Sequence, residues 1–236
     1  MIRLIIIKLK FRNKVYIYKM PPRIISIEGN IGSGKSTMVE YLKQHFKYDP
    51  TVCFLQEPVD IWNTITDNNN INIIENYYKD QKKYAFQFQM MAYISRISLL
   101  RDAIKKDYKI IVTERCIFTD ANVFAKMLYD EGKIEEIEYK IYKRWFDEFI
   151  KDIPPISLVY VKTSPEICYK RVLARNRLGE EIPVTYLRQC HNYHEKWINN
   201  NQECLNVLTL DGNDTISEEL KKNNIEKIKE FSMLCY

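Results

Sequence analysis

Residues 29–37 read GNIGSGKST, which matches the pattern GxxxxGK[ST] of a loop that wraps around a phosphate group. The β-branched run Ile24–Glu28 precedes the motif and a segment of helical period, Lys35–Lys47, follows it, so the motif stands between a strand and a helix, as such a loop must. Three of the six glycines in the chain lie here, because backbone N–H groups can turn toward a phosphate only where side chains do not obstruct them. The motif predicts a nucleoside triphosphate site; the alternative is a glycine-rich turn without a ligand.

Each part of this loop has an expected contact. Lys35 reaches the β- and γ-phosphates, the Ser36 hydroxyl reaches Mg²⁺, and the helix that begins there adds the positive end of its dipole. The motif therefore predicts a nucleoside triphosphate with Mg²⁺, and the family resemblance described below implies that the triphosphate is ATP. The residues expected to hold the triphosphate are Gly29, Asn30, Ile31, Gly32, Ser33, Gly34, Lys35, Ser36 and Thr37.

Short β-branched runs alternate with longer segments of helical period along the rest of the chain, which is typical of a parallel sheet flanked by helices. A length of 236 residues fits one domain of this α/β class. The five predicted strands are Ile24–Glu28, Val52–Gln56, Ile110–Thr113, Leu158–Val161 and Val207–Leu210. The predicted helices are Lys35–Lys47, a broken stretch from Ile73, a long helix near Lys83–Lys106, two pieces within Thr119–Ile150, and helices beginning at Ser164, after Pro183 and near Ser217.

Positive charge is concentrated at the start of the chain. Residues 1–23 carry seven basic side chains and no acidic one, which leaves 29 basic and 31 acidic residues, a net charge of −2, for the remainder. We therefore expect no nucleic-acid partner. Residues 1–21 are expected to be a poorly ordered basic extension of a domain spanning 22–236, with an organelle-targeting segment as the alternative. The longest apolar run there, Leu4–Ile7, is too short for a membrane span, so no membrane partner is expected either.

Cysteine usage bears on the compartment. The six cysteines are widely spaced, with no CxxC pair, and indicate reduced thiols rather than disulfides or a metal site. We expect a cytoplasmic protein, or a mitochondrial one if the basic extension is a targeting segment.

Carboxylates stand at the ends of two predicted strands, where an open α/β sheet binds its ligands. Glu57 follows the second strand and could take the proton from an attacking hydroxyl. Glu114 and Arg115 follow the third, pairing an acid that can hold Mg²⁺ with a guanidinium that can clamp oxygens. The chain contains no NKxD or DxxG motif, so a guanine-specific switch protein is not expected.

Basic side chains recur between the fourth predicted strand and Pro183. Arg171 and Arg175 are four residues apart and share a helix face, and Arg177 follows just before a loop that contains Gly179. Cations on such a segment suit a lid that closes over transferring phosphates. A solvated basic helix face is the alternative.

These motifs together resemble the deoxyribonucleoside kinases, the group with deoxycytidine, deoxyguanosine, deoxyadenosine and mitochondrial-type thymidine kinases. The resemblance runs from Ile24 to about Ile198 and implies a P-loop kinase fold with an arginine-rich lid. It also implies transfer of the ATP γ-phosphoryl group to the 5′-hydroxyl of a deoxyribonucleoside. The motifs that carry it are IEGNIGSGKST at 27–37, EPVDIW at 57–62, the block 78–96 with FQ and SR, TERCIFTD at 113–120 and RVLARNRLGEEIP at 171–183.

The resemblance also implies residue roles. Glu57 matches the general base, and Arg115 matches a residue that contacts the 5′-oxygen. Tyr78 and a lid acid match the groups that hold the 3′-hydroxyl; the lid is one residue shorter than usual, so the acid is Glu180 or Glu181, with Glu180 preferred. The residues implied to enclose the base are Trp62, Phe88 and Phe124, with Gln89 at its edge, and those implied to assist phosphoryl transfer are Lys35, Arg171, Arg175 and Arg177.

Spacing gives an independent reason to group some of these residues. Gln89 and Arg96 are seven apart and lie on one face of the long predicted helix, while Asp120 and Phe124 are four apart on the next. If Asp120 pairs with Arg96 over the base, the pair fills the space that a thymine methyl would need. This combination is similar to the deoxycytidine and purine members, so we expect deoxyadenosine, deoxyguanosine or deoxycytidine rather than thymidine.

The pattern departs from the family at three positions and leaves alternatives open. Cys116, Phe118 and Ala121 stand where Ser, Tyr and Arg are common. A nucleoside monophosphate kinase shares the loop and the lid, and a non-catalytic nucleotide-binding subunit would share the fold. A homodimer through helices near 94–104 and 139–149 fits the family, although the same apolar face could be ordinary core.

Overall fold

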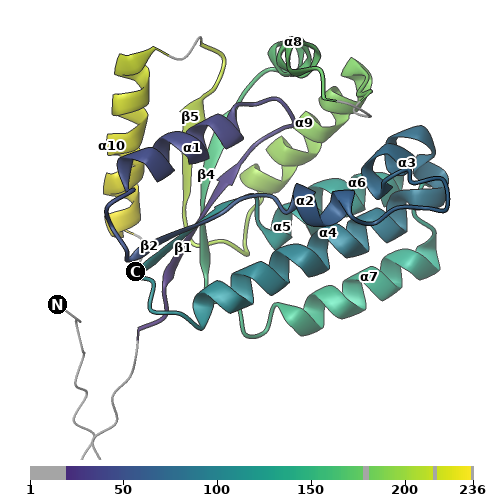
Figure 1. Ribbon diagram of the computed structural model, residues 1–236, viewed down its shortest axis with the longest axis horizontal. Helices are drawn as coiled ribbons and strands as arrows, with labels where there is room; N and C mark the ends of the chain where they lie inside the picture. The colour runs from purple at the N-terminus through teal and green to yellow at the C-terminus, as the bar shows by residue number, and fades with distance from the viewer. Residues whose placement is uncertain (1–19, 178–180, 215–216, 235–236) are drawn as a thin grey trace, which may run out of the picture.

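The computed structural model describes residues 20–177, 181–214 and 217–234, which form a five-stranded sheet between two layers of helices (Figure 1). All strand pairs are parallel, and the strand order is β2-β3-β1-β4-β5. The five predicted strands are confirmed, as is the α/β class; residues 1–19 of the predicted extension lie outside the described part. The strands are β1 Arg23–Glu28, β2 Val52–Leu55, β3 Ile110–Glu114, β4 Ile156–Lys162 and β5 Val207–Asp211.

The predicted helices are confirmed with shifts of a few residues at their ends. The long helix begins at Gln81, because the Asp80 side chain accepts a hydrogen bond from the backbone N–H of Lys83 and so caps it. The helices are α1 Lys35–His45, α2 Val59–Asn63, α3 Ile73–Lys79, α4 Gln81–Ile104, α5 Ile117–Thr119, the π-helical η1 Asp120–Ala125, α6 Lys126–Asp130, α7 Glu136–Phe149, α8 Pro165–Arg175, α9 Val184–Asn199 and α10 Glu218–Leu234. The sequence did not predict α2, whose five residues are too few to show a helical period.

The two faces of β1 pack into different halves of the core. Ile25 and Ile27 contact the cluster formed with α1 and α10, whereas Ile24 belongs to the larger cluster beneath α4, α7 and α9. This division follows from the alternation of side chains along a strand. It also directs Glu28, four residues after Ile24, toward the larger helical layer.

The carboxyl ends of three strands meet at one edge of the sheet. Ile27 of β1 lies opposite Glu114 of β3, and Leu55 of β2 lies opposite Thr113. The phosphate loop after β1, Glu57 after β2 and Arg115 after β3 therefore converge, as expected for the ligand side of an open α/β sheet. Within the described residues no helix is long and apolar enough to cross a membrane, and the five cysteines described there are free thiols.

Two leucines, one buried and one exposed, test the assignment of the hydrophobic core. Leu158 is fully buried in β4, whereas Leu173 on α8 is 59% exposed. We expect Leu158→Ala to lower the free energy of unfolding by about 2–5 kcal/mol, because it removes buried methyl groups and leaves a cavity. Leu173→Ala should change it by less than about 0.5 kcal/mol. Urea unfolding of both variants measures this, and equal losses would contradict the assigned burial.

Candidate active site

The phosphate loop is held in a conformation that only glycine adopts readily. Gly29, Gly32 and Gly34 have φ values of 145°, 79° and 101°. A Cβ atom on Gly29 would lie 2.6 Å from Ser33 Oγ, and one on Gly32 would lie 2.5 Å from the carbonyl oxygen of Cys168. The glycines are thus required by backbone conformation and by close packing against β4 and α8.

The side chains of the phosphate loop differ in their burial and in their hydrogen bonds. Asn30 is buried and donates a hydrogen bond of 2.8 Å to the carbonyl of Leu187, so its side chain ties the loop to α9. Ser33 Oγ is buried and has no hydrogen-bond partner among the described residues, which fits a phosphate oxygen as its acceptor. The Thr37 side chain is exposed.

Lys35 carries a buried cation at the start of α1. Its Nζ donates to the carbonyl oxygen of Asn30 at 3.2 Å, and the residue is 5% exposed. Burial, together with the nearby Arg115 guanidinium, lowers the pKa of Lys35 to about 8. The ammonium group is therefore held at a cost that bound phosphate would offset.

Glu57 is held by two guanidinium groups. Its Oε1 accepts from Arg115 Nη1 at 2.7 Å and from Arg96 Nη2 at 3.1 Å. Burial disfavours the charged carboxylate, but Arg115 and Arg96 outweigh it, and the pKa of Glu57 falls to about 2. Glu57 is thus an ionised and oriented hydrogen-bond acceptor at neutral pH.

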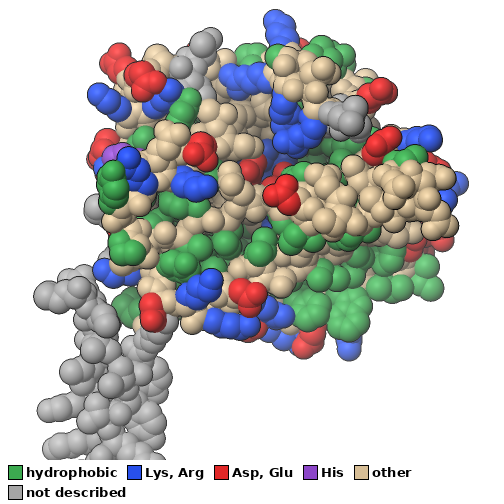
Figure 2. Space-filling model, viewed as in Figure 1, with side chains coloured by type: hydrophobic (Ala, Val, Ile, Leu, Met, Phe, Trp, Pro, Cys, Tyr) green, Lys and Arg blue, Asp and Glu red, His purple; other side chains and the backbone are tan. Residues whose placement is uncertain are grey.

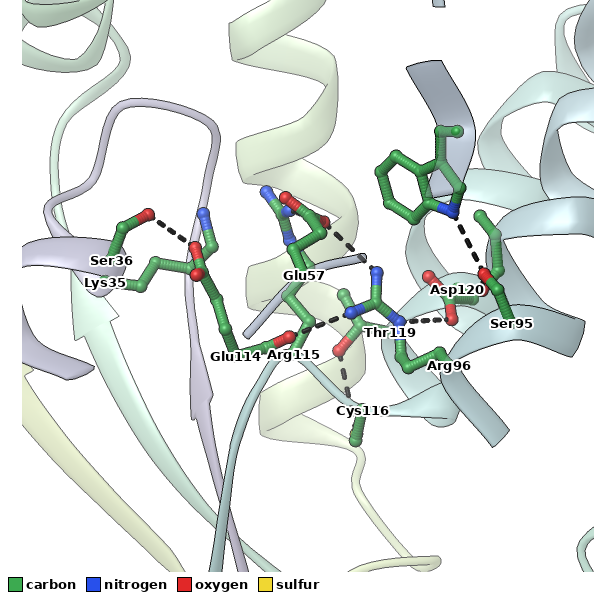
Figure 3. A network of polar contacts seen from close by, with 12 residues as sticks. Lys35, Ser36, Glu57, Ser95, Arg96, Glu114, Arg115, Cys116, Thr119 and Asp120 are labelled. Atoms are coloured by element: carbon green, nitrogen blue, oxygen red, sulfur yellow. Dashed lines mark hydrogen bonds and ion pairs between the residues drawn. The ribbon is translucent and has the colours of Figure 1, made fainter. Parts of the chain in front are cut away.

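Arg96 links this carboxylate to the base-binding region predicted from the sequence. It donates to Asp120 Oδ2 through Nε at 2.9 Å and to the Glu114 carbonyl through Nη1 at 2.8 Å (Figure 3). Arg96 and Asp120 thus form the pair on which the expected base preference was conditional, whereas the sequence had not indicated that Arg96 also binds Glu57. Burial raises the pKa of Asp120 to about 6, even though Arg96 opposes the shift.

Ser36 and Glu114 form a hydroxyl–carboxylate pair beside the phosphate loop. Ser36 Oγ donates to Glu114 Oε1 at 2.5 Å (Figure 3). Oxygen ligands of this type suit Mg²⁺, which is commonly held by one hydroxyl or carboxylate together with substrate phosphates and water. The donor set therefore fits the cation expected with a triphosphate.

A single cavity of about 300 Å³ joins the phosphate loop to an aromatic pocket. Trp62 and Phe88 meet edge to face at 5.5 Å, and Tyr77 stacks on Phe88 at 4.6 Å. The guanidinium of Arg115 lies 5.1 Å from the centre of the Phe124 ring. The predicted site residues that line this cavity are Ile31, Lys35, Ser36, Glu57, Trp62, Tyr78, Phe88, Gln89, Arg96, Glu114, Arg115, Asp120, Phe124, Arg175 and Arg177.

Arginines reach the site from α8 and the segment after it. Arg175 and Arg177 are exposed and line the cavity, and basic side chains gather beside α8 in Figure 2. Arg171 does not line it; it donates to the Ser33 carbonyl at 3.1 Å and to the Asp214 carbonyl at 3.2 Å. Arg171 therefore supports the backbone of the phosphate loop from outside the cavity.

The remaining residues at the site are the predicted lid acid and three residues that the sequence had not predicted. Glu180 lies outside the described residues, and Glu181 is exposed and is not part of the cavity lining. Tyr77 and Tyr186 line the cavity and share a hydrogen bond of 2.9 Å between their hydroxyls. Glu28 is fully buried beneath the site. The sequence placed Glu28 at a strand end beside the loop, but nothing in the pattern showed what it contacts.

Comparison with known proteins gives a consistent result. A family model described as deoxynucleoside kinase matches residues 25–233. A probable deoxycytidine kinase of fowlpox virus is 37% identical over 209 residues, covering 85% of this chain and 84% of the relative. Human deoxycytidine kinase is 32% identical over 237 residues, covering 88% and 90%. Human mitochondrial thymidine kinase 2 is 32% identical over 178 residues, covering 74% and 64%.

The buried ammonium of Lys35 gives a stability prediction. Its folded-state pKa of about 8 lies below the unfolded value of 10.5, so the charged form is destabilised on folding. Without nucleotide at pH 7, we expect Lys35→Met to raise the free energy of unfolding by about 1–3 kcal/mol. Because the folded wild type loses this proton first, the difference should shrink as the pH rises from about 8 toward 10.5.

Urea unfolding across this pH range measures the effect. Lys43→Met is the matched control, since Lys43 is exposed on the same helix, and should change stability by less than about 0.5 kcal/mol. A Lys35→Met variant less stable than the wild type would show that the buried ammonium is not a net cost.

Proposed function

The chain belongs to the deoxynucleoside kinase family, and from this premise we propose how its side chains carry out the reaction. It is an ATP-dependent deoxyribonucleoside kinase, which transfers the γ-phosphoryl group of ATP to a deoxyribonucleoside. The proposal rests on one observation: a single cavity is lined at one end by the phosphate loop and at the other by aromatic side chains, with Glu57 between them. Residues 22–236 are the catalytic domain in this proposal.

Glu57 acts as the general base. Because its pKa lies near 2, the carboxylate is ionised and can accept a hydrogen bond from the 5′-hydroxyl. In a loose phosphoryl-transfer transition state the hydroxyl proton need not leave before the new P–O bond forms, so orientation matters more than basicity. Arg115 and Arg96 supply that orientation by fixing Oε1.

Arg115 also serves the transferring group. Its Nε and Nη2 are buried and have no hydrogen-bond partner among the described residues, and the residue as a whole is only 4% exposed. Such donors can bind oxygens of the transferring phosphoryl group or the 5′-oxygen. Lys35, Arg175 and Arg177 would bind further phosphate oxygens, and Arg171 would support the loop that holds them.

Ser36 and Glu114 are the residues that would hold Mg²⁺. When bound, the cation supplies positive charge that offsets the charge of the β- and γ-phosphates. The Ser36 hydroxyl now donates to Glu114, and that hydrogen bond would give way to a metal contact.

The nucleoside occupies the aromatic part of the cavity. Trp62, Phe88 and Phe124 would enclose the base and Gln89 would bind its edge, while Tyr78 and the lid acid would hold the 3′-hydroxyl. The buried Arg96–Asp120 pair occupies space beside the base and supports a preference for deoxycytidine or a purine deoxynucleoside over thymidine. Two of the relatives reported above carry deoxycytidine kinase in their names, which is consistent with this preference.

Initial rates with Mg-ATP and each of the four natural deoxynucleosides test the reaction and the base preference. We expect turnover with deoxycytidine or a purine deoxynucleoside and little with thymidine. Glu57→Gln should lower kcat by a factor on the order of 10² to 10⁴, because the amide cannot take the proton.

The outcomes separate the alternatives. A thymidine preference would refute the specificity proposal and leave the kinase activity. Activity only on a deoxynucleoside monophosphate, or ATP binding without turnover on any nucleoside, would favour the monophosphate kinase or the non-catalytic subunit instead. Full activity in Glu57→Gln would remove Glu57 from the role of base.

A homodimer through α4 and α7 is a further part of the proposal. Ile137, Ile141 and Trp145 recur every four residues along α7 and are 67%, 42% and 47% exposed, and Ile94 on α4 is 45% exposed. Hydrophobic side chains gather over α7 in Figure 2. An apolar helix face of this kind favours burial against a second copy.

Trp145→Glu with Ile141→Glu should shift the protein from dimer to monomer in sedimentation equilibrium, because each buried charge would cost several kcal/mol at such an interface. The control Leu173→Glu places the same change on an exposed leucine of α8 and should leave the dimer intact. A monomeric wild type, or an unchanged dimer in the double variant, would contradict this surface.

A further inference from the structure

Glu28 is a buried carboxylate that has no role in the proposed reaction mechanism. It is the last residue of β1, directly before Gly29, and it is fully buried. It does not line the cavity, so it contacts neither nucleoside nor phosphate there. A buried carboxylate is costly unless hydrogen bonds compensate it, so its partners indicate what it is for.

Three donors converge on this carboxylate. Oε1 accepts from Ser26 Oγ at 2.5 Å and from the backbone N–H of Cys116 at 2.8 Å, and Oε2 accepts from Thr119 Oγ1 at 2.6 Å. Ser26 belongs to β1 itself. The other two donors belong to the segment that directly follows Arg115, 88 and 91 residues further along the chain.

That segment begins with an unusual backbone conformation. Arg115 has φ of 61°, in the left-handed region that non-glycine residues rarely adopt. Such a conformation persists only where surrounding contacts hold it. The contacts here are two successive backbone N–H groups: that of Arg115 donates to the Ile27 carbonyl at 3.0 Å, and that of Cys116 donates to Glu28.

Glu28 also completes the start of the following helix. Cys116 is the N-cap of α5 and offers no side-chain cap, and Thr119 is the third residue of that helix. In a capping box the third residue supplies an acid that accepts from the N-cap N–H. Here the acid comes from β1, and its second oxygen accepts from the Thr119 hydroxyl (Figure 3 shows Cys116 and Thr119 beside Arg115).

We propose that Glu28 is a positioning residue for Arg115, a proposal that rests on the proposed function. By fixing the Arg115–Cys116 backbone, Glu28 directs the guanidinium to Glu57 at 2.7 Å and over the ring of Phe124. Its charge also lies close enough to Arg115 and Lys35 to favour their cationic forms. Glu28 thus connects the strand before the phosphate loop to the cation that stabilises the transferring group.

Steady-state kinetics of Glu28→Met and Glu28→Gln test this proposal. Methionine keeps the volume and removes both acceptors, so kcat should fall about 30-fold or more while KM for the nucleoside and for ATP changes less than about three-fold. Glutamine keeps one acceptor for the Cys116 N–H and should restore a large part of kcat. Ser26→Ala removes a described donor that lies outside the Arg115 segment, and it should leave kcat within about two-fold of the wild type.

A double-variant cycle distinguishes positioning from general stability. When Arg115→Ala is already present, Glu28→Met should lower kcat by no more than about two-fold, because the group it positions is gone. If Glu28→Met does not fold, Thr119→Val replaces it in the cycle, with an expected loss of about five-fold that disappears in Arg115→Ala.

Two results overturn the proposal: an unchanged kcat in the foldable variants, or losses that multiply with Arg115→Ala. A wild type inactive on all four deoxynucleosides would instead refute the proposed function, so the two failures are distinct.

Discussion

The active site depends on placing opposite charges, out of water, at one edge of the sheet. Arg96 and Arg115 are 7% and 4% exposed, and both bind the same oxygen of Glu57. Neither a buried guanidinium nor a buried carboxylate is stable alone in such surroundings, but each compensates the other where geometry is good. The network thus links the segments that directly follow β2 and β3 to α4 and η1.

The same network connects residues that have different proposed roles in the reaction. Arg96 binds Asp120 on one side and Glu57 on the other, so the residue proposed to lie beside the nucleobase also orients the proposed general base. Glu28 makes a second proposed connection of this kind, because it binds the backbone N–H of Cys116, the residue directly after Arg115.

At this edge of the sheet, some features that suit ligand binding lower the stability of the fold. Lys35 is a buried ammonium group, and Arg115 has a left-handed backbone and two guanidinium nitrogens with no hydrogen-bond partner among the described residues. Features of this kind persist at active sites because the surrounding structure supports them and ligands use them. The well-packed halves of the core on both faces of the sheet supply that support.

The sequence alone determined the parallel α/β sheet, the phosphate loop and the family, because each depends on local periods or on residues close together in the chain. Helix spacing and the family resemblance also made an Arg96–Asp120 pair the condition for a base preference, and the structure contains that pair. The sequence missed the second role of Arg96, the tyrosine pair at residues 77 and 186, the short helix α2 and the contacts of Glu28. These depend on how strands and helices far apart in sequence come together, and only the tertiary structure decides which buried donor meets which buried acceptor.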